Sequence, residues 1–512
     1  MSVLAPLVGK HGHRRVGVSL LQMPQLAGWK QHLPSPFDET VAVMHLKVYA
    51  FDDTLLLSGA NLSSDYFEQR QDRYVEVRRA PALAEHYHGL IARLSQCDRA
   101  FQLKRRQGSD DAARGNGGGS ADSNGGESFA TQLLAPAPDG SRMGFEAALA
   151  RFFAPEASAP AESVIGSGDA GTPDASFVDT TLVPTLQFGQ GRFDGATCDA
   201  DLVHALLEGC AHGVPGDTAS RTPGVAGGAG EIRLASGYFN LLPSVQRVVA
   251  RSRADVSVVT ASPQANGFFG AAGIKGALPQ AYVELETDFL HTCARERAGQ
   301  TGANDGVPAE EGSTTTNSAS TDADSEADDA ASQGDALGHV RVYEYVRPGW
   351  TFHAKGLWLR VGDALLSELL PSRAPQTSRA SSAASASTPG GGSDKGQQRA
   401  TAPDTPNATL VGSSNFGARS AQRDLESQVF LCTDNEALRQ RLLEEWAALS
   451  QSTEDAESAP AAGGGAGDSA VAAVAELVDS DVMARPERQL QGWGWSHGHW
   501  IKPVTNMIRT FM

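Results

Sequence analysis

The chain has 512 residues, a net charge of −18 at pH 7 and 5 cysteines, none of which form a Cys-x-x-Cys pair. Residues 301–336 contain nine acidic residues and residues 451–484 contain seven, with no Lys or Arg in either, so the remaining sequence is close to neutral. A site for an anionic substrate is therefore compatible with this composition. The charges indicate no basic patch for nucleic acid, and the scattered cysteines indicate a reducing compartment and no zinc site.

Four segments are runs of Gly, Ser, Ala, Thr and acidic residues with almost no large apolar residue. They cannot bury enough surface to offset chain entropy, so they are predicted to be disordered. These segments are 108–126, about 298–336, 372–406 and 451–475. The rest is long enough for two packed halves of one α/β fold, which we predict at 1–160 and 161–512.

Taken in chain order, the first strands are predicted at 15–21 and 41–51. Side chains two apart on a strand share a face, so His45 and Lys47 should point the same way. The run TLLLSGAN then predicts a second short strand and a turn that brings Asn61 back toward them. An imidazole, an ammonium and an amide in one place suit a phosphate group. A helix is predicted over 81–97.

The second half repeats this pattern. Strands are predicted within 231–240 and 255–263, and the stretch TFHAKGLWL then carries a second His-x-Lys, His353 and Lys355. The turn in TLVGSSN supplies a second asparagine, Asn415, and a helix is predicted over 435–451. Asn61 precedes Asp72 by eleven residues, as Asn415 precedes Glu426. We infer an internal duplication with one composite active site.

The two predicted halves differ before their histidines. A strand at 231–240 precedes His353, whereas only 44 residues precede His45. We therefore expect the first half to be incomplete and the sequence to begin inside that domain. No stretch of eighteen apolar residues occurs, so no bilayer-spanning helix is predicted, and any contact with a membrane surface would be peripheral. The aromatic and basic residues of 492–512 suit either that contact or packing on the protein itself.

The pattern His45-x-Lys47-x4-Asp52-x6-Gly59 resembles the signature of the phospholipase D superfamily. This resemblance implies a pseudo-twofold α/β fold in which each half is a mixed sheet flanked by helices. The stretches GANLSSDYFEQRQDRYV, GWTFHAKGLWL, GSSNFGARSAQRDLESQ and WIKPVTNMIRTFM are similar to the eukaryotic phosphatidylglycerophosphate synthases. The second motif departs from the pattern because Arg360 stands where the aspartate is expected.

That family transfers a phosphatidyl group from CDP-diacylglycerol to glycerol 3-phosphate and releases CMP. The resemblance implies the same substrates here, a place at the mitochondrial inner membrane, and a phosphohistidine intermediate, with His45 as nucleophile by analogy. His353 then serves as acid and base. No cofactor or metal is expected, because the lysines supply positive charge. The implied site comprises the catalytic residues His45, Lys47, Asp52, His353 and Lys355 and the substrate-binding residues Asn61, Asn415, Asp72 and Glu426.

Three alternatives remain open from the residues. A phosphodiesterase of phospholipase D type could use the same side chains, because water and an acceptor hydroxyl need the same general base. A cardiolipin or phosphatidylserine synthase would differ only in donor or acceptor. A non-catalytic lipid-binding scaffold is suggested by Arg360 and by the short first half, although a scaffold has no need of both His-x-Lys pairs.

Overall fold

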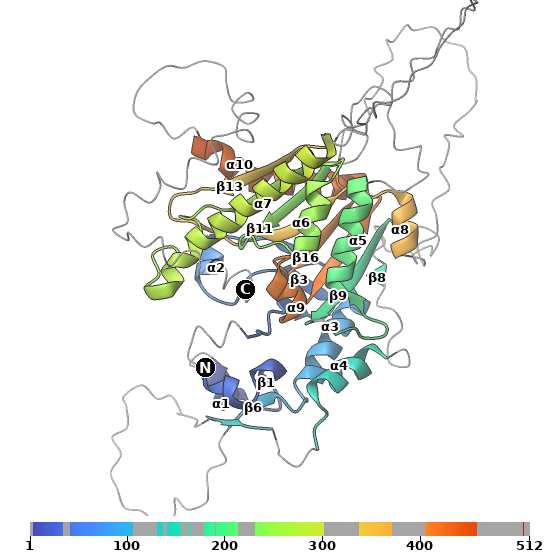
Figure 1. Cartoon of the computed structure of the whole chain (residues 1–512). Helices are drawn as coiled ribbons and strands as arrows, with labels where there is room; N and C mark the ends of the chain where they lie inside the picture. The colour runs from blue at the N-terminus through green and yellow to red at the C-terminus, as the bar shows by residue number, and fades with distance from the viewer. Residues whose placement is uncertain are drawn as a thin grey trace, which may run out of the picture.

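The computed structural model describes residues 4–33, 41–105, 131–136, 141–154, 163–164, 179–189, 191–212, 231–301, 337–370, 405–457 and 505. Within them, a ten-stranded mixed sheet forms the centre of the second half (Figure 1). Its main path runs β10 (Thr197–Cys198), β9 (Thr180–Phe188), β18 (Gln428–Thr433), β16 (Ala408–Gly412), β15 (Lys355–Leu359), β11 (Glu231–Ser236), β12 (Asp255–Ala261) and β13 (Val340–Tyr345). The short strands β8 (Ser163–Val164) and β17 (Leu425–Glu426) pair with β9.

The central strands are apolar on both faces because both faces are covered. Strand β12 reads DVSVVTA, and six of its seven residues are buried. Strands β11, β12 and β13 are mutually parallel, and β15 pairs antiparallel with β11. Continuous runs rich in β-branched residues are typical of strands buried in this way. The candidate active site lies at the start of β15, in the middle of this sheet.

Helices cover one face of the large sheet (Figure 1). Side chains from these helices form one apolar core with the strands, which includes Leu206, Val249 and Phe289. The helices are α5 (Asp199–His212), α6 (Pro243–Ala250), α7 (Leu278–Thr301) and α8 (Asp363–Leu369). A 3-10 helix, η5 (Gly273–Ala277), leads into α7. Among the described residues, no helix is both long and apolar enough to span a bilayer.

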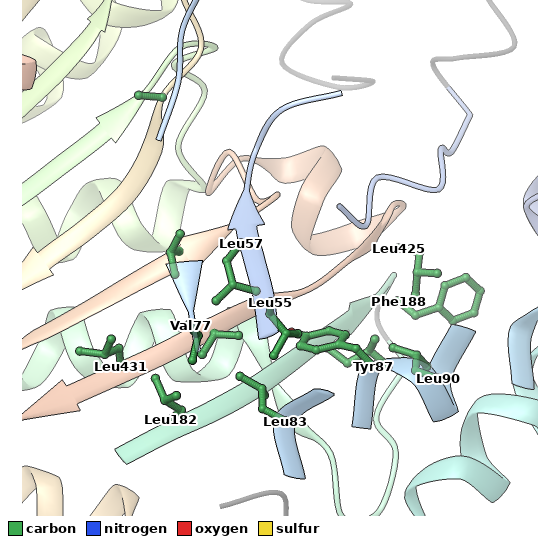
Figure 2. Close-up of a cluster of buried hydrophobic side chains, with 14 of the residues drawn as sticks. Leu55, Leu57, Val77, Leu83, Tyr87, Leu90, Leu182, Phe188, Leu425 and Leu431 are labelled. Carbon is green, nitrogen blue, oxygen red and sulfur yellow. The ribbon is translucent and has the colours of Figure 1, made fainter. Parts of the chain in front are cut away.

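The other face is covered by the C-terminal helix α10 (Glu436–Glu457) and by the first half. Leu55 and Val77 of the first half join Tyr87, Leu182 and Leu431 in a second apolar core (Figure 2). The first-half elements up to the site are α1 (Leu4–His11), β1 (Val18–Leu21), η1 (Pro24–Leu26), η2 (Gly28–His32), β2 (Val48–Phe51), β3 (Thr54–Ser58) and α2 (Asp65–Glu68). They are followed by β4 (Arg70–Gln71), β5 (Tyr74–Val77), α3 (Pro81–Leu94), β6 (Ala100–Arg105), β7 (Thr131–Leu134) and α4 (Phe145–Phe153).

One buried cation joins the halves. The Arg73 guanidinium donates to both carboxylate oxygens of Glu445 at 2.7 and 2.8 Å and to the Leu410 carbonyl at 2.7 Å. It also lies 4.2 Å from the centre of the Trp358 ring. A Cβ at Gly356 would come within 2.6 Å of this guanidinium, so only glycine fits beside it. Arg73 therefore fixes the segment that carries Asp72 onto the large sheet.

The sequence predictions fit this fold only in part. A mixed α/β fold is confirmed, but the described first half contains two antiparallel three-stranded sheets, β1-β6-β7 and β2-β3-β5, instead of one mixed sheet. Its strands are too short and too exposed on one face to form a sheet covered on both sides. The strand predicted at 41–51 begins only at Val48, and the strand predicted at 15–21 begins at Val18.

Several helix and loop boundaries also differ from the predictions. Helix α3 ends at Leu94, before the predicted end at 97. Helices α7 and α10 continue to Thr301 and Glu457, past the points where two disordered segments were predicted to begin. The remainder of these two segments, the segment at 108–126 and most of 372–406 lie outside the described residues. So does the aromatic tail of 492–512, apart from Thr505, which donates a hydrogen bond to Glu284 of α7.

Candidate active site

Backbone pairing brings each histidine beside an acid that is distant in sequence. Met44 pairs in parallel with Leu425, and the amide of His45 donates to the Leu425 carbonyl at 2.9 Å, so His45 lies next to Glu426. An equivalent backbone pairing occurs at His353. The strand predicted for His45 is absent because this stretch of chain pairs with β17 of the second half before β2 begins.

In the second motif, β14 (Thr351–Phe352) pairs in parallel with β4 of the first half, with Phe352 opposite Gln71. The amide of His353 donates to the Gln71 carbonyl at 2.7 Å, which places His353 next to Asp72. In both motifs the residue before the histidine is paired with the residue before the acid. The two histidines are therefore positioned by equivalent contacts that run in opposite directions between the halves.

Each imidazole is hydrogen-bonded to the acid of the other motif. His45 Nδ1 donates to the Glu426 carboxylate, with its oxygens at 2.9 and 3.0 Å. His353 Nδ1 donates to Asp72 Oδ2 at 2.8 Å. Both acids are buried, with no exposed side-chain surface. A carboxylate at Nδ1 fixes the tautomer, so Nε2 of each ring is the nitrogen left for chemistry.

The two lysines are also held alike. Lys47 Nζ donates to the carbonyl of His45 at 2.8 Å, and Lys355 Nζ donates to the carbonyl of His353 at 2.8 Å. Lys355 Nζ also lies 2.8 Å and 3.0 Å from the two ring nitrogens of His353. A Cβ at Gly59 would come within 3.1 Å of the Lys355 stem and 3.2 Å of the Asp72 carboxylate. The glycine of the first motif thus makes room for the lysine of the second.

Burial governs the electrostatics of the imidazoles. It lowers the pKa of His45 to about 4, although Glu426 opposes this shift. Burial, together with the neighbouring Lys355, lowers the pKa of His353 to about 3. Although burial raises the pKa of Glu426, its contacts with His45 and Lys47 hold that pKa below its usual value. Both imidazoles are therefore neutral at pH 7, which is the state in which Nε2 can attack or accept a proton.

Burial also lowers the pKa of both lysines. The pKa of Lys47 falls to about 8, and Arg419 contributes to the shift. Lys355 is more deeply buried, and its pKa falls to about 7, with Lys47 and Arg70 contributing. Two ammonium groups that repel each other in a dry site are well placed to bind an anion, because a bound anion relieves this repulsion.

The predicted asparagines both lie at this site, Asn61 near His353 and Asn415 near Glu426. Asn61 Nδ2 donates to the Tyr66 hydroxyl at 3.2 Å, and that hydroxyl lies 3.3 Å from Nε2 of His353. The backbone amide of Asn415 donates to Ser420 Oγ at 3.2 Å, and Ser420 Oγ donates to Glu426 at 2.7 Å. The buried side-chain oxygen of Asn415 has no hydrogen-bond partner among the described residues.

Asp52 is the one predicted catalytic residue that the structure does not bring to this site. It lies exposed in the turn between β2 and β3, with a left-handed φ of 54°. The turn is at the far end of a hairpin from Gly59, since each strand residue adds about 3.3 Å. Arg360, which stands at the aspartate position of the second motif, follows the last residue of β15, Leu359, and is exposed.

Sequence reasoning missed two tyrosines. The ring of Tyr66 meets the His353 ring edge-on at 5.0 Å, and the Tyr238 ring does so at 5.6 Å. For Tyr66 a signal was present: it lies five residues after Asn61, as Ser420 lies five residues after Asn415. Tyr238 lies in the loop after β11 and carries no comparable signal.

Two neutral imidazoles with fixed tautomers, two lysines and two amides make a site for nucleophilic substitution at phosphorus. In the described residues, no three His, Cys, Asp or Glu side chains gather into a group that could hold a metal ion. The class of protein that this geometry defines is therefore a phosphoryl-group or phosphatidyl-group transferase or hydrolase with paired His-x-Lys motifs.

No protein-family model matches the chain. Curated relatives are named CDP-diacylglycerol–glycerol-3-phosphate 3-phosphatidyltransferase. The chain is 28% identical over 519 residues to the mitochondrial protein of Gallus gallus, covering 100% of this chain and 69% of the relative. It is 27% identical over 516 residues to that of Homo sapiens, covering 100% and 68%. The protein of Saccharomyces cerevisiae is 26% identical over 485 residues, covering 90% and 70%.

These relatives confirm the resemblance to the eukaryotic phosphatidylglycerophosphate synthases, and the chain spans about two thirds of their length. Among solved structures, the phosphatidylserine synthase of Haemophilus influenzae aligns with a TM-score of 0.41 at 15% identity. This alignment covers 81% of the present chain and 63% of the solved chain.

Proposed function

We propose that this protein transfers the phosphatidyl group of CDP-diacylglycerol to glycerol 3-phosphate, giving phosphatidylglycerophosphate and CMP. The observation that carries the proposal is the crossed pairing of His45 with Glu426 and of His353 with Asp72, which unites both motifs in one site. The named activity of the relatives selects this donor and this acceptor.

In the first step, Nε2 of His45 attacks the phosphorus that carries diacylglycerol. The bond from this phosphorus to the CMP oxygen breaks, and its electron pair leaves with CMP. The Glu426 carboxylate at Nδ1 stabilises the positive charge that develops on the ring. Two observations support His45 as the nucleophile: its side chain is 20% exposed against 5% for His353, and no described residue hydrogen-bonds its Nε2.

In the second step, His353 takes the proton from the acceptor hydroxyl as the hydroxyl oxygen attacks the phosphohistidine. The phosphorus–nitrogen bond breaks, and its electron pair returns to His45. CMP leaves through a weakly basic phosphate oxygen and needs little protonation, so the main task of His353 is that of a base. Its lowered pKa keeps it neutral for this task, and a bound phosphoryl anion raises that pKa toward the working pH.

We further propose that the fold is a pseudo-twofold duplication around this site and that the protein works at the mitochondrial inner membrane as a peripheral protein. Support for the duplication comes from the matched backbone pairings at His45 and His353 and the matched lysine-to-carbonyl bonds. Support for the location comes from relatives that are named mitochondrial.

The test is the release of CMP from CDP-diacylglycerol in detergent micelles, with and without glycerol 3-phosphate. Release should depend on the acceptor. His45→Ala and His353→Ala should each reduce transfer by at least about 100- to 10,000-fold, since loss of an acid or base costs that much and loss of a nucleophile costs more. His88→Ala, at an exposed position of α3, is the matched control and should be fully active.

A label on the phosphatidyl phosphorus distinguishes the histidines. It should be trapped on His353→Ala and be absent from His45→Ala, and the reverse pattern would exchange the two roles. Release of CMP at the same rate without glycerol 3-phosphate would show a hydrolase, and full transfer by either histidine variant would exclude the two-histidine mechanism.

A further inference from the structure

An arginine–aspartate ion pair lies near each histidine, at matching positions of the two motifs. Arg70 lies nine residues after Asn61 and pairs with Asp65 at 2.9 Å. At the equivalent positions after Asn415 the charges are reversed, because Arg419 pairs with Asp424 at 2.8 Å. Each pair borders the catalytic site, because the Arg70 guanidinium lies 4.4 Å from the centre of the Tyr66 ring and Asp424 accepts a hydrogen bond from the amide of Val43, two residues before His45.

The two ion pairs differ in how firmly the arginine is held. The Asp424 side chain is only 3% exposed, and it also accepts a hydrogen bond from the Val43 amide. Asp65 is 46% exposed, on the short helix α2. Because an exposed carboxylate is readily solvated, Arg70 can exchange Asp65 for an anionic ligand at little cost, whereas Arg419 cannot leave a buried partner.

The guanidinium of Arg70 has more N–H donors than its contacts with described residues occupy. This group carries five N–H donors. Nε donates to Thr351 at 2.9 Å, one terminal nitrogen pairs with Asp65, and the guanidinium also contacts the side chain of Tyr66. A Cβ at Gly267 would lie 3.5 Å from this terminal nitrogen and 2.8 Å from the Tyr238 hydroxyl. Glycine at this position therefore lets the backbone pack closely against Tyr238, beside Arg70.

Arg70 also lies near His353, the proposed base. Its guanidinium lies 4.4 Å from the centre of the Tyr66 ring, and that ring lies 5.0 Å from the His353 ring. One aromatic ring thus separates Arg70 from the group that deprotonates the acceptor. In glycerol 3-phosphate the glycerol backbone separates the attacking hydroxyl from the phosphate, whereas in the donor the leaving oxygen is bonded directly to the CMP phosphorus. A phosphate on Arg70 and a hydroxyl at His353 are therefore more readily supplied by the acceptor than by the donor.

We propose that Arg70, with Tyr238 and Gly267 beside it, forms the subsite for the phosphate of the acceptor, an inference that rests on the proposed transferase function. The bound phosphate displaces Asp65 and accepts hydrogen bonds from the guanidinium, which holds the acceptor hydroxyl at Nε2 of His353. This subsite makes an acceptor that carries a phosphomonoester a better substrate than glycerol itself.

The experiment compares the two half-reactions in Arg70→Gln. The KM for glycerol 3-phosphate should rise about 10- to 100-fold, the cost of losing charge-assisted hydrogen bonds. The preference for glycerol 3-phosphate over glycerol, as a ratio of kcat/KM, should fall by a similar factor. Exchange of labelled CMP into CDP-diacylglycerol needs no acceptor. Measured at about pH 6, where Lys355 is charged with or without Arg70, it should stay within about 2-fold of the wild-type rate because the donor does not use this subsite.

Two further variants keep the result interpretable. Arg78→Gln removes an exposed arginine that is paired with Glu76 outside the site. It should change neither the KM for glycerol 3-phosphate nor the KM for CDP-diacylglycerol. Arg70→Lys keeps the charge without the guanidinium fork and should restore part of the preference for glycerol 3-phosphate.

An unchanged KM for glycerol 3-phosphate in Arg70→Gln overturns the subsite. A fall in CMP exchange equal to the fall in transfer also overturns it, because Arg70 would then act only by supporting Tyr66 and His353. Failure of the wild-type protein to release CMP in response to glycerol 3-phosphate is a different result, and it rejects the transferase function itself.

Discussion

The surroundings of His45 and His353 share one plan but differ in packing. Both histidines follow a residue paired in parallel with the opposite half, and both donate Nδ1 to a buried acid. His353, however, lies within the large sheet region, where a tyrosine hydroxyl reaches its Nε2. Near His45 the corresponding position is Ser420, which bonds the acid instead of the ring. The comparison shows that two histidines with the same backbone pairing and the same Nδ1 hydrogen bond can perform different tasks when the neighbours of Nε2 differ.

The largest effects should come from replacing the buried acids that are hydrogen-bonded to Nδ1 of each histidine. Glu426→Gln and Asp72→Asn keep the size of each acid but favour the wrong imidazole tautomer, so each should lower kcat by about 100- to 10,000-fold. The two variants should differ in which step they slow. Asp72→Asn should accumulate protein labelled from the donor, because His353 fails as a base, whereas Glu426→Gln should form little label.

Asp53→Asn, in the exposed turn between β2 and β3, is the control for these variants and should behave as the wild type. Equal labelling of Asp72→Asn and Glu426→Gln would contradict the division of tasks between the two histidines.

The pH profile should sharpen the comparison through the lysines. Lys355 and Lys47 carry a positive charge only below their pKa values of about 7 and about 8, while His45 is neutral only above about 4. The value of kcat/KM for CDP-diacylglycerol, which reports the free protein, should therefore be highest between about 4 and 7 and decline as the pH rises through 7 to 8. The kcat profile should extend to higher pH, because the anionic donor raises both lysine pKa values. A kcat/KM that still increases at pH 9 would show that the lysines are not needed in the charged form.

The smallest expected effects concern stability and separate the two ion pairs. Asp424→Asn leaves Arg419 facing a buried neutral group and should lower the free energy of unfolding by about 1–3 kcal/mol. Asp65→Asn removes an exposed partner and should lower it by at most about 1 kcal/mol. Urea denaturation followed by circular dichroism measures both values. Equal losses would mean that Arg70 is held as firmly as Arg419.

Much of the site could be predicted because its signals are local. Two His-x-Lys pairs and two intervals of eleven residues led to both histidines, both lysines, both asparagines and both acids. The strongly patterned elements, such as β12 and α3, were also found, because burial imposes periodicity on the sequence. Asp52 matches the aspartate of the family signature in sequence. The structure does not bring it to the site, because it lies in the exposed turn at the far end of the hairpin.

The crossed assignment of acids to histidines could not be predicted. His45 and Glu426 are separated by 381 residues, and His353 and Asp72 by 281, so no local pattern states which acid meets which ring. The partners are chosen by the parallel pairings of Met44 with Leu425 and of Phe352 with Gln71. Tyr238 was missed for a related reason, because tertiary packing alone brings it to His353.

Arg73 bears on how the chain folds. Its guanidinium belongs to the first half. Its hydrogen-bond acceptors, Glu445 and Leu410, and the Trp358 ring beneath it all belong to the second half. A first half produced alone would lack every one of these partners, and a second half alone would hold the Glu445 carboxylate without its counter-ion. Neither half is then an autonomous folding unit, and the protein should lose structure in a single cooperative transition. A polypeptide cut between the halves should regain activity only when both pieces are refolded together.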